Sequence, residues 1–181
     1  MKPIESIKIA ISGKSGCGNT TVSRLVAGLL GIRLINFTFR NLAEERGLSL
    51  AEVLEAAKRD DSWDKETDAR QIALARDGVN GYVLGSRLAI WLLPEADVSV
   101  YLAADISVRA RRIFQREGGR YEDVERFTQK RDREDNERYK RIYQIDNDVY
   151  DFAGMVVDAG AFRADEIAAR IVARARALCA A

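Results

Sequence analysis

The stretch Gly13-Lys-Ser-Gly-Cys-Gly-Asn-Thr-Thr21 is the part of the sequence that decides the fold. It follows the glycine-loop pattern G-x-x-x-x-G-K-[ST] at both glycines and at Thr20, but Asn19 stands where that pattern has lysine. In such loops the glycines let backbone N–H groups surround a phosphate, and the start of the next helix adds its positive dipole end. A lysine does occur nearby, at Lys14, five residues before the expected place.

The segments on both sides of this stretch have the character that a phosphate-binding loop requires. Residues 7–11, Ile-Lys-Ile-Ala-Ile, are rich in β-branched side chains and predict a short strand. Residues 21–30 carry apolar side chains at helical spacing and are followed by Gly31, which predicts a helix end. A second strand is expected at 33–37. The loop therefore lies in a strand–loop–helix–strand unit.

The rest of the chain alternates in the same manner. Helices are expected at 39–46, 50–59, 62–76, 105–117, 121–143 and 164–179, and strands at 81–84, 98–103 and 155–157. Ser49 is a candidate N-cap, and Gly118-Gly119 separate two of the helices. Strands that are separated by helices predict a five-stranded parallel sheet covered on both faces, an α/β fold.

Composition excludes several classes of function. The 181 residues include 47% hydrophobic and 31% charged side chains, with a net charge of +1, so one domain without general affinity for nucleic acid or membranes is expected. The absence of histidine excludes Ser-His-Asp and Cys-His catalysis and most zinc sites. Two cysteines give no pairing pattern, and no leader or membrane span is expected, which favours a cytoplasmic protein.

Three further motifs point to a family. They are Arg87-Leu-Ala-Ile-Trp-Leu-Leu-Pro-Glu-Ala-Asp97, Gln129-Lys-Arg-Asp-Arg-Glu-Asp-Asn-Glu-Arg-Tyr-Lys-Arg-Ile-Tyr143 and Asp146-Asn-Asp-Val-Tyr-Asp151. In this order and with the glycine loop, they resemble the short, archaeal-type branch of the cytidylate kinases. The resemblance implies a P-loop kinase, a monomer that uses Mg²⁺ and moves the γ-phosphoryl group of ATP to CMP or dCMP.

The resemblance also implies a domain plan within residues 1–181. The core is expected at 6–37, 81–111 and 145–181, a helical acceptor-binding insertion at about 38–80, and a short lid with its following helix at about 112–144.

Site residues follow from the loop and from the resemblance. The residues expected to bind ATP phosphates are Gly13, Ser15, Gly16, Cys17, Gly18, Asn19, Thr20, Thr21, Arg112 and Arg116, with Thr20 also expected to bind Mg²⁺. Lys14, Arg131, Asp135 and Arg138 are expected to act in catalysis. Arg40, Asp68 and Arg87 are expected to bind the acceptor. Arg131, Asp135 and Arg138 share one face of a helix, so the two guanidinium groups can face neighbouring phosphates.

Several alternatives stay open. The missing lysine charge can be supplied by Lys14 or by arginines of the lid, and either source is compatible with phosphoryl transfer, which depends on positioning and on cations. A nucleotide-binding module without turnover, a kinase for another small acceptor, and a dimeric switch ATPase that uses Lys14 across an interface are the other hypotheses. For residues 129–143, the alternative without a binding function is a solvated helix with many ion pairs.

Overall fold

The computed structural model describes residues 2–78 and 80–180, and the chain divides into two compact units. A sheet unit is formed by Met1–Leu34 and Asn80–Ala181, and a helical unit by Ile35–Val79. Each unit is described by itself below.

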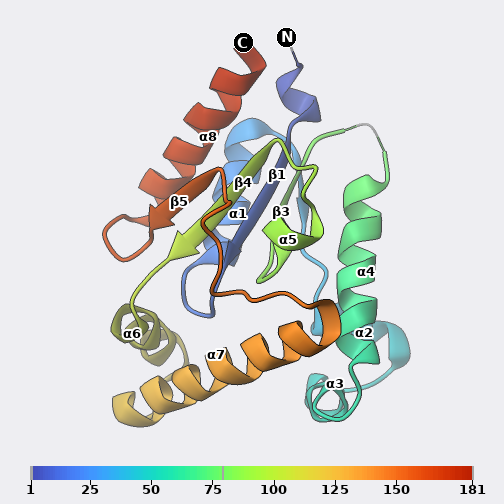
Figure 1. The fold of residues 1–181 in the computed structure, drawn as a ribbon, viewed down its shortest axis with the longest axis vertical. Coiled ribbons are helices and arrows are strands. Elements are labelled where there is room, and N and C mark those ends of the chain that lie inside the picture. The colour runs from blue at the N-terminus through green and yellow to red at the C-terminus, as the bar shows by residue number, and fades with distance from the viewer. Residues whose placement is uncertain (1, 79, 181) are drawn as a thin grey trace. The chain divides into compact units, whose positions relative to one another are not determined.

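The sheet unit is built from short parallel strands that alternate with helices (Figure 1). Its elements are η1 (Ile4–Ser6), β1 (Lys8–Gly13), α1 (Asn19–Leu30), β2 (Arg33–Ile35), β3 (Tyr82–Gly85), α5 (Ala89–Leu92), β4 (Val98–Ala103), α6 (Ile106–Glu117), α7 (Tyr121–Tyr143), β5 (Met155–Asp158) and α8 (Ala164–Ala180). Within the described residues the sheet has five strands in the order β2-β3-β1-β4-β5. β1 pairs in parallel with β3 and β4, and β4 pairs in parallel with β5.

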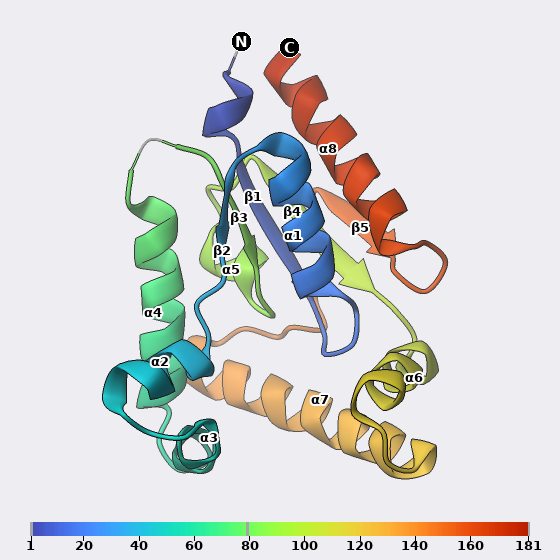
Figure 2. The same ribbon diagram turned by 180° about the vertical axis from the view of Figure 1, so that it is seen from behind.

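The core lies around β1 because this central strand is apolar on both faces. Ile9 and Ile11 on one face and Ala10 on the other are fully buried, as expected for a strand in the middle of a parallel sheet. α1 and α8 cover one face (Figure 2), and the buried side chains of α8, such as Ile167 and Ile171, follow a helical stripe. α5 and the segment between α7 and β5 cross the opposite face (Figure 1).

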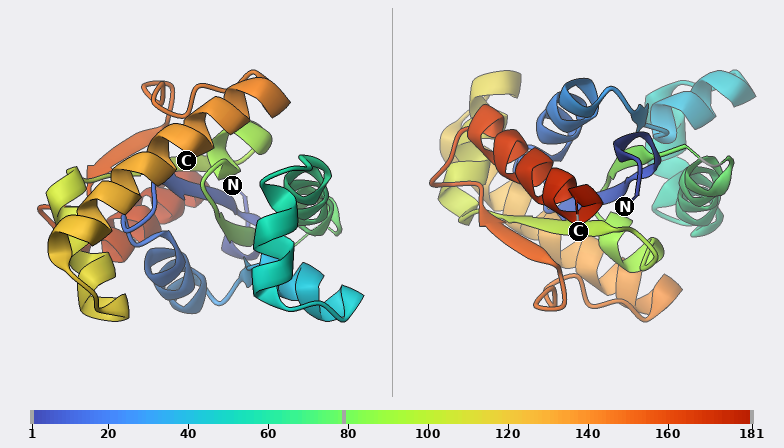
Figure 3. Two further views of the ribbon diagram at one scale, coloured as in Figure 1. Left: turned by 90° about the horizontal axis from the view of Figure 1, so that it is seen from below. Right: turned by 90° about the horizontal axis from the view of Figure 1, so that it is seen from above.

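The glycine loop and the loops after β3 and β4 leave the sheet at the same end, the carboxyl ends of the strands. β1, β3 and β4 end at Gly13, Gly85 and Ala103, and parallel strands place their carboxyl ends on the same side. α7 lies across this end in Figures 1 and 2 and passes in front of it when the unit is seen from below (Figure 3, left). The fold therefore brings a long charged helix to the end of the sheet where ligands of α/β proteins bind.

The helical unit consists of α2 (Phe39–Arg46), α3 (Leu50–Ala57) and α4 (Ser62–Arg76). Ser49 is the N-cap of α3, as predicted, and it forms a capping box with Glu52. Gln71 donates to the carbonyl oxygen of Phe37 at 2.7 Å. Arg46 forms an ion pair with Glu66, and its guanidinium lies 4.5 Å from the centre of the Trp63 ring.

The predicted elements are confirmed with small shifts at their ends. The strand expected at 33–37 ends at Ile35, and the helix expected at 50–59 ends at Ala57. The single-turn helix α5 was not predicted, because four apolar residues have too little periodicity to indicate a helix. Across residues 2–78 and 80–180, no helix combines the length and the apolar character that a membrane span needs.

Candidate active site

The glycine loop adopts the backbone conformation of an anion site. Gly16 and Gly18 have φ angles of +85° and +99°, which side chains rarely tolerate. Gly18 precedes α1 as its N-cap and offers no side-chain cap to the first turn of the helix. The N–H groups of that turn are therefore available to an anion, and the helix dipole favours negative charge there.

Asn19, which replaces the loop lysine, is turned back onto the loop. Its Nδ2 donates to the carbonyl oxygen of Gly13 at 2.7 Å. A Cβ atom on Gly13 would lie 2.7 Å from Asn19 Oδ1 and 2.7 Å from the Leu102 carbonyl oxygen, so only glycine fits at this position. Asn19 thus fastens the start of the loop to the start of α1 and does not supply the missing charge.

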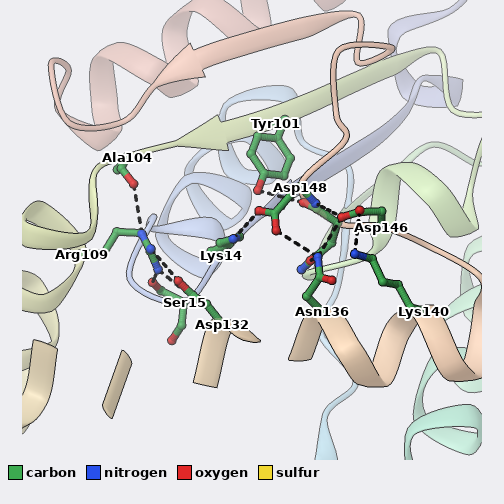
Figure 4. Close-up of polar contacts among 11 residues, drawn as sticks. Lys14, Ser15, Tyr101, Ala104, Arg109, Asp132, Asn136, Lys140, Asp146 and Asp148 are labelled. Carbon is green, nitrogen blue, oxygen red and sulfur yellow. Dashed lines mark hydrogen bonds and ion pairs between the residues drawn. The ribbon is translucent and has the colours of Figure 1, made fainter. Parts of the chain in front are cut away.

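Lys14 is the one charged side chain within residues 13–21, and its ammonium forms an ion pair with Asp148 (Figure 4). The distance from Nζ to Asp148 Oδ1 is 2.5 Å. The lysine side chain is 21% exposed and that of Asp148 is 57% exposed, so water screens the pair from the aspartate side and the contact contributes little to stability by itself. Asp148 lies on the segment between α7 and β5, within the motif at 146–151, and it was not predicted as a site residue.

Arg109 of α6 is the second contact of the loop that sequence analysis missed. Its Nη1 donates to the Ser15 carbonyl oxygen at 3.1 Å (Figure 4). Nη1 and Nη2 also donate to the two carboxylate oxygens of Asp132 of α7, at 3.2 and 2.6 Å. Nε donates to the Ala104 carbonyl oxygen at 3.1 Å. Arg109 is 5% exposed and therefore tightly fixed. Gly16 packs against it, because a Cβ atom there would lie 2.8 Å from the Arg109 carbonyl oxygen.

The two arginines expected to bind ATP phosphates from the lid are placed differently. Arg112 donates to the Cys17 carbonyl oxygen at 3.4 Å and to the Ala159 carbonyl oxygen at 2.5 Å, so it ties the loop to the end of β5. Arg116 is largely exposed and pairs with Glu117. A role of these side chains at the phosphates stays a prediction.

The expected charged face of α7 forms a cluster with Arg87, which follows β3. We call Arg87, Arg131, Asp135 and Arg138 the arginine cluster. Asp135, only 5% exposed, lies 3.2 Å from Arg87 Nε, 4.0 Å from Arg131 Nε and 2.8 Å from Arg138 Nη2. Three positive charges around one carboxylate leave an excess of positive charge, which suits a phosphate.

The acid–base properties of the cluster reflect this excess. The pKa of Arg131 is lowered from its ordinary value, first by the positive charge of Arg87 and then by burial. Burial also raises the pKa of the Tyr139 phenol, which keeps this neighbour of Arg87 neutral. Arg131 and Arg87 thus repel each other, and an anion bound between them would reduce that repulsion.

α7 reaches the glycine loop through two residues on an adjacent stripe of the helix. Asp132 connects to the Ser15 carbonyl oxygen through Arg109, and Asn136 connects to Lys14 through Asp148, to which its Nδ2 donates at 3.0 Å. These two residues are one turn apart and flank Asp135. The same helix that carries most of the arginine cluster is thus connected to the loop at two positions on one neighbouring stripe.

A cavity of about 740 Å³ opens beside the loop. Its lining includes Lys14 and Arg109, the segment residues Asp148 and Tyr150, and Val156 and Asp158 of β5. The Tyr150 ring stacks on that of Tyr101, with centroids 3.8 Å apart, and gives the cavity a rigid wall. A volume of this size is enough for a small-molecule ligand of nucleotide size.

The remaining loop residues have distinct environments. Thr20 and Thr21 lie exposed in the first turn of α1, so the Thr20 hydroxyl is open to a ligand or metal ion. Cys17 is 3% exposed, and burial raises the pKa of its thiol to about 11, which excludes a reactive thiolate at neutral pH. Within the described part of the chain, no group of three or more cysteine or carboxylate side chains forms a metal cage.

Two of the expected acceptor-binding residues belong to the helical unit. Arg40 is exposed in the first turn of α2, and Asp68 is partly buried on α4. The contacts described above are those of the sheet unit, and the acceptor roles of these two residues stay predictions.

Comparisons with known proteins agree with this architecture. A solved shikimate kinase from Acinetobacter baumannii, in complex with shikimate, matches with a TM-score of 0.66 at 16% identity over 96% of both chains. At that identity the match shows the fold alone, that of a P-loop kinase.

Sequence comparisons are more specific. Residues 8–160 match the model of the cytidylate kinase-like family. "Cytidylate kinase 2" of Borreliella afzelii is 46% identical over 165 residues, covering 89% of this chain and 92% of the relative. A cytidylate kinase of Pyrococcus horikoshii is 36% identical, covering 82% of this chain and 79% of the relative. The chain therefore belongs to the cytidylate kinase-like family.

Proposed function

We propose that the protein transfers the γ-phosphoryl group of ATP to a pyrimidine nucleoside monophosphate, with CMP and dCMP as the first acceptors. The observation that carries this proposal is the presence of two separate anion sites on one unit. The glycine loop suits the phosphates of a donor, and the arginine cluster suits the phosphate of an acceptor. The names of the cytidylate kinase relatives support the choice of acceptor.

The donor would bind along the loop and the adjoining cavity. Backbone N–H groups of the loop and of the first turn of α1 would hold the β- and γ-phosphates, with Lys14 as the local cation. The base and sugar would occupy the cavity beside Tyr101 and Tyr150.

Mg²⁺ fits this arrangement through Thr20. Magnesium in such enzymes is held by few protein ligands together with substrate phosphates and water, so the open Thr20 hydroxyl is a sufficient first ligand. Held there by Thr20, Mg²⁺ would supply positive charge next to the phosphates.

Catalysis would rest on positioning and on positive charge. Arg131 and Arg138, oriented by Asp135, would stabilise the negative charge that spreads over the transferred phosphoryl group. Arg109 and Asp132 would keep the loop in place through the Ser15 carbonyl oxygen. No histidine base is needed, because phosphoryl transfer depends little on covalent chemistry by the protein.

A transfer assay with Mg-ATP against CMP, dCMP, UMP, dUMP, AMP, GMP and shikimate tests the proposal. Preferential formation of CDP or dCDP is the expected result. An Arg138→Ala preparation, purified in parallel, measures the contribution of contaminating kinases. ATP binding without product from any acceptor would contradict the proposal and favour a binding module, and phosphorylation of shikimate alone would favour another small-acceptor kinase.

A further inference from the structure

We infer that Asp148 is a positioning residue for Lys14, and that it couples the donor site to α7. The inference rests on the proposed function, since it assigns a partner to the cation of the donor site. It starts from the contact between Lys14 Nζ and Asp148 Oδ1 at 2.5 Å (Figure 4).

Asp148 is held from two directions, although its side chain is 57% exposed. Its backbone N–H donates to Asp146 Oδ1 at 3.0 Å, which closes a tight turn. Its Oδ2 accepts from Asn136 Nδ2 at 3.0 Å. The carboxylate is therefore fixed by the turn and by α7, and it can fix a flexible lysine in turn.

Asn136 is the centre of this support. It is 8% exposed, and its Nδ2 also lies 2.8 Å from both Asp146 Oδ1 and Asn147 Oδ1, so its two N–H groups are shared among these oxygens and Asp148 Oδ2. Lys140, one turn further along α7, binds Asp146 at 2.8 Å. The turn that carries Asp148 is thus attached to α7 at two successive positions, next to Asp135 and Arg138.

The negative charge of Asp148 is compatible with a bound triphosphate because Lys14 lies against it. A carboxylate that lines the same cavity as the glycine loop would repel a triphosphate. Lys14 lies against it and offsets that repulsion. An ammonium has three N–H donors, so one bond to Asp148 leaves two donors for phosphate oxygens. The ion pair with Asp148 restricts the four side-chain torsions of Lys14 and so keeps its ammonium beside the glycine loop.

The test is a double-mutant cycle of Asp148→Asn and Lys14→Ala. Asparagine keeps the shape of Asp148 and its acceptor for Asn136 but removes the charge that holds Lys14. We expect Asp148→Asn to lower kcat by about 10- to 100-fold and to weaken Mg-ATP affinity severalfold, since a displaced Lys14 contacts the phosphates less well in the bound state and in the transition state. In the Lys14→Ala background the same change should alter kcat by less than about twofold. Asp151→Asn, an exposed charge change on the same segment, is the matched control and should have no effect.

Three results would overturn the inference. Wild-type kcat in Asp148→Asn would show that the contact has no role. An equal loss of kcat in the presence and absence of Lys14 would show that Asp148 acts by itself. A raised requirement for Mg²⁺ that persists in Lys14→Ala would make Asp148 a metal ligand instead.

Binding measurements separate this inference from the proposed function. If the wild type forms no product with any acceptor, the proposed function fails. The cycle is then measured as the affinity for Mg-ATP by calorimetry. A non-additive effect of the two changes on affinity would still support the coupling, and additive effects would overturn it.

Discussion

We propose that the glycine loop and the arginine cluster both bind anions, but they are made from different parts of the chain. The loop, residues 13–21, uses backbone N–H groups, two glycines with positive φ and a single charged side chain. The cluster uses the side chains of three arginines around one buried carboxylate. A backbone site is therefore sensitive to added atoms, whereas a side-chain site is sensitive to a removed charge. We therefore expect different kinds of substitution to impair the two sites.

The largest effect is expected in the cluster. Arg138→Ala should lower kcat by about 10³-fold, as for other arginines that stabilise a phosphoryl-transfer transition state. Steady-state kinetics with Mg-ATP and CMP measures it. Arg133→Ala, on the same helix but exposed, should retain wild-type activity. If Arg138→Ala stayed within tenfold of the wild type, the cluster would be a structural feature of α7.

The second largest effect is expected at the ion pair between Arg109 and Asp132, which connects the loop to α7. Asp132→Asn leaves the guanidinium of Arg109 buried without its bidentate partner, and we expect the free energy of unfolding to fall by about 3 kcal/mol. Urea denaturation measures this change. Glu134→Gln breaks the exposed pair with Lys130 and should cost less than about 0.5 kcal/mol. Equal effects of the two changes would refute the role of Asp132 as a buried anchor.

In the glycine loop, we expect a single added methyl group to lower both stability and nucleotide affinity. Gly16→Ala forces an alanine to φ +85° and against the backbone of Arg109, so we expect unfolding to become easier by about 1–2 kcal/mol and nucleotide affinity to fall. Gly28→Ala is the matched control. That glycine lies within α1 with open space at its Cβ position, and alanine should stabilise the helix by about 0.5–1 kcal/mol. Unchanged nucleotide binding in Gly16→Ala would mean that the loop holds no phosphate.

The smallest effect concerns pH. Bonds from Lys140, from Asn136 and from the Asp148 N–H hold the pKa of Asp146 at about 2, below its ordinary value of 3.8. The folded state therefore prefers the ionised form, and the stabilisation is present above about pH 4 and lost as pH falls toward 2. The stability difference between wild type and Asp146→Asn, from urea denaturation, should shrink over that range. A constant difference would show that the carboxylate charge is irrelevant.

Sequence patterns predicted most of the fold because its elements are locally determined. The apolar run at 98–103 and the charged run at 121–143 became β4 and α7 with the predicted bounds. The charged face of α7 was also predicted, since Arg131, Asp135 and Arg138 are related by helix geometry alone. α5 was missed, and so was Arg109, whose partners Ser15 and Asp132 lie 94 and 23 residues away in the chain. No local spacing encodes such a contact.

By itself, the sequence determined that a glycine loop joins a strand to a helix, and that its usual lysine is absent. Those features depend on neighbouring residues and on backbone preferences. Only the tertiary structure decided what became of the missing charge. Asn19 folds back onto Gly13, and Lys14 meets Asp148, a residue more than a hundred positions further along. The physical reason is that an ion pair depends on distance in space. Lys14 and Asp148 come close together only after the segment between α7 and β5 has packed across the sheet.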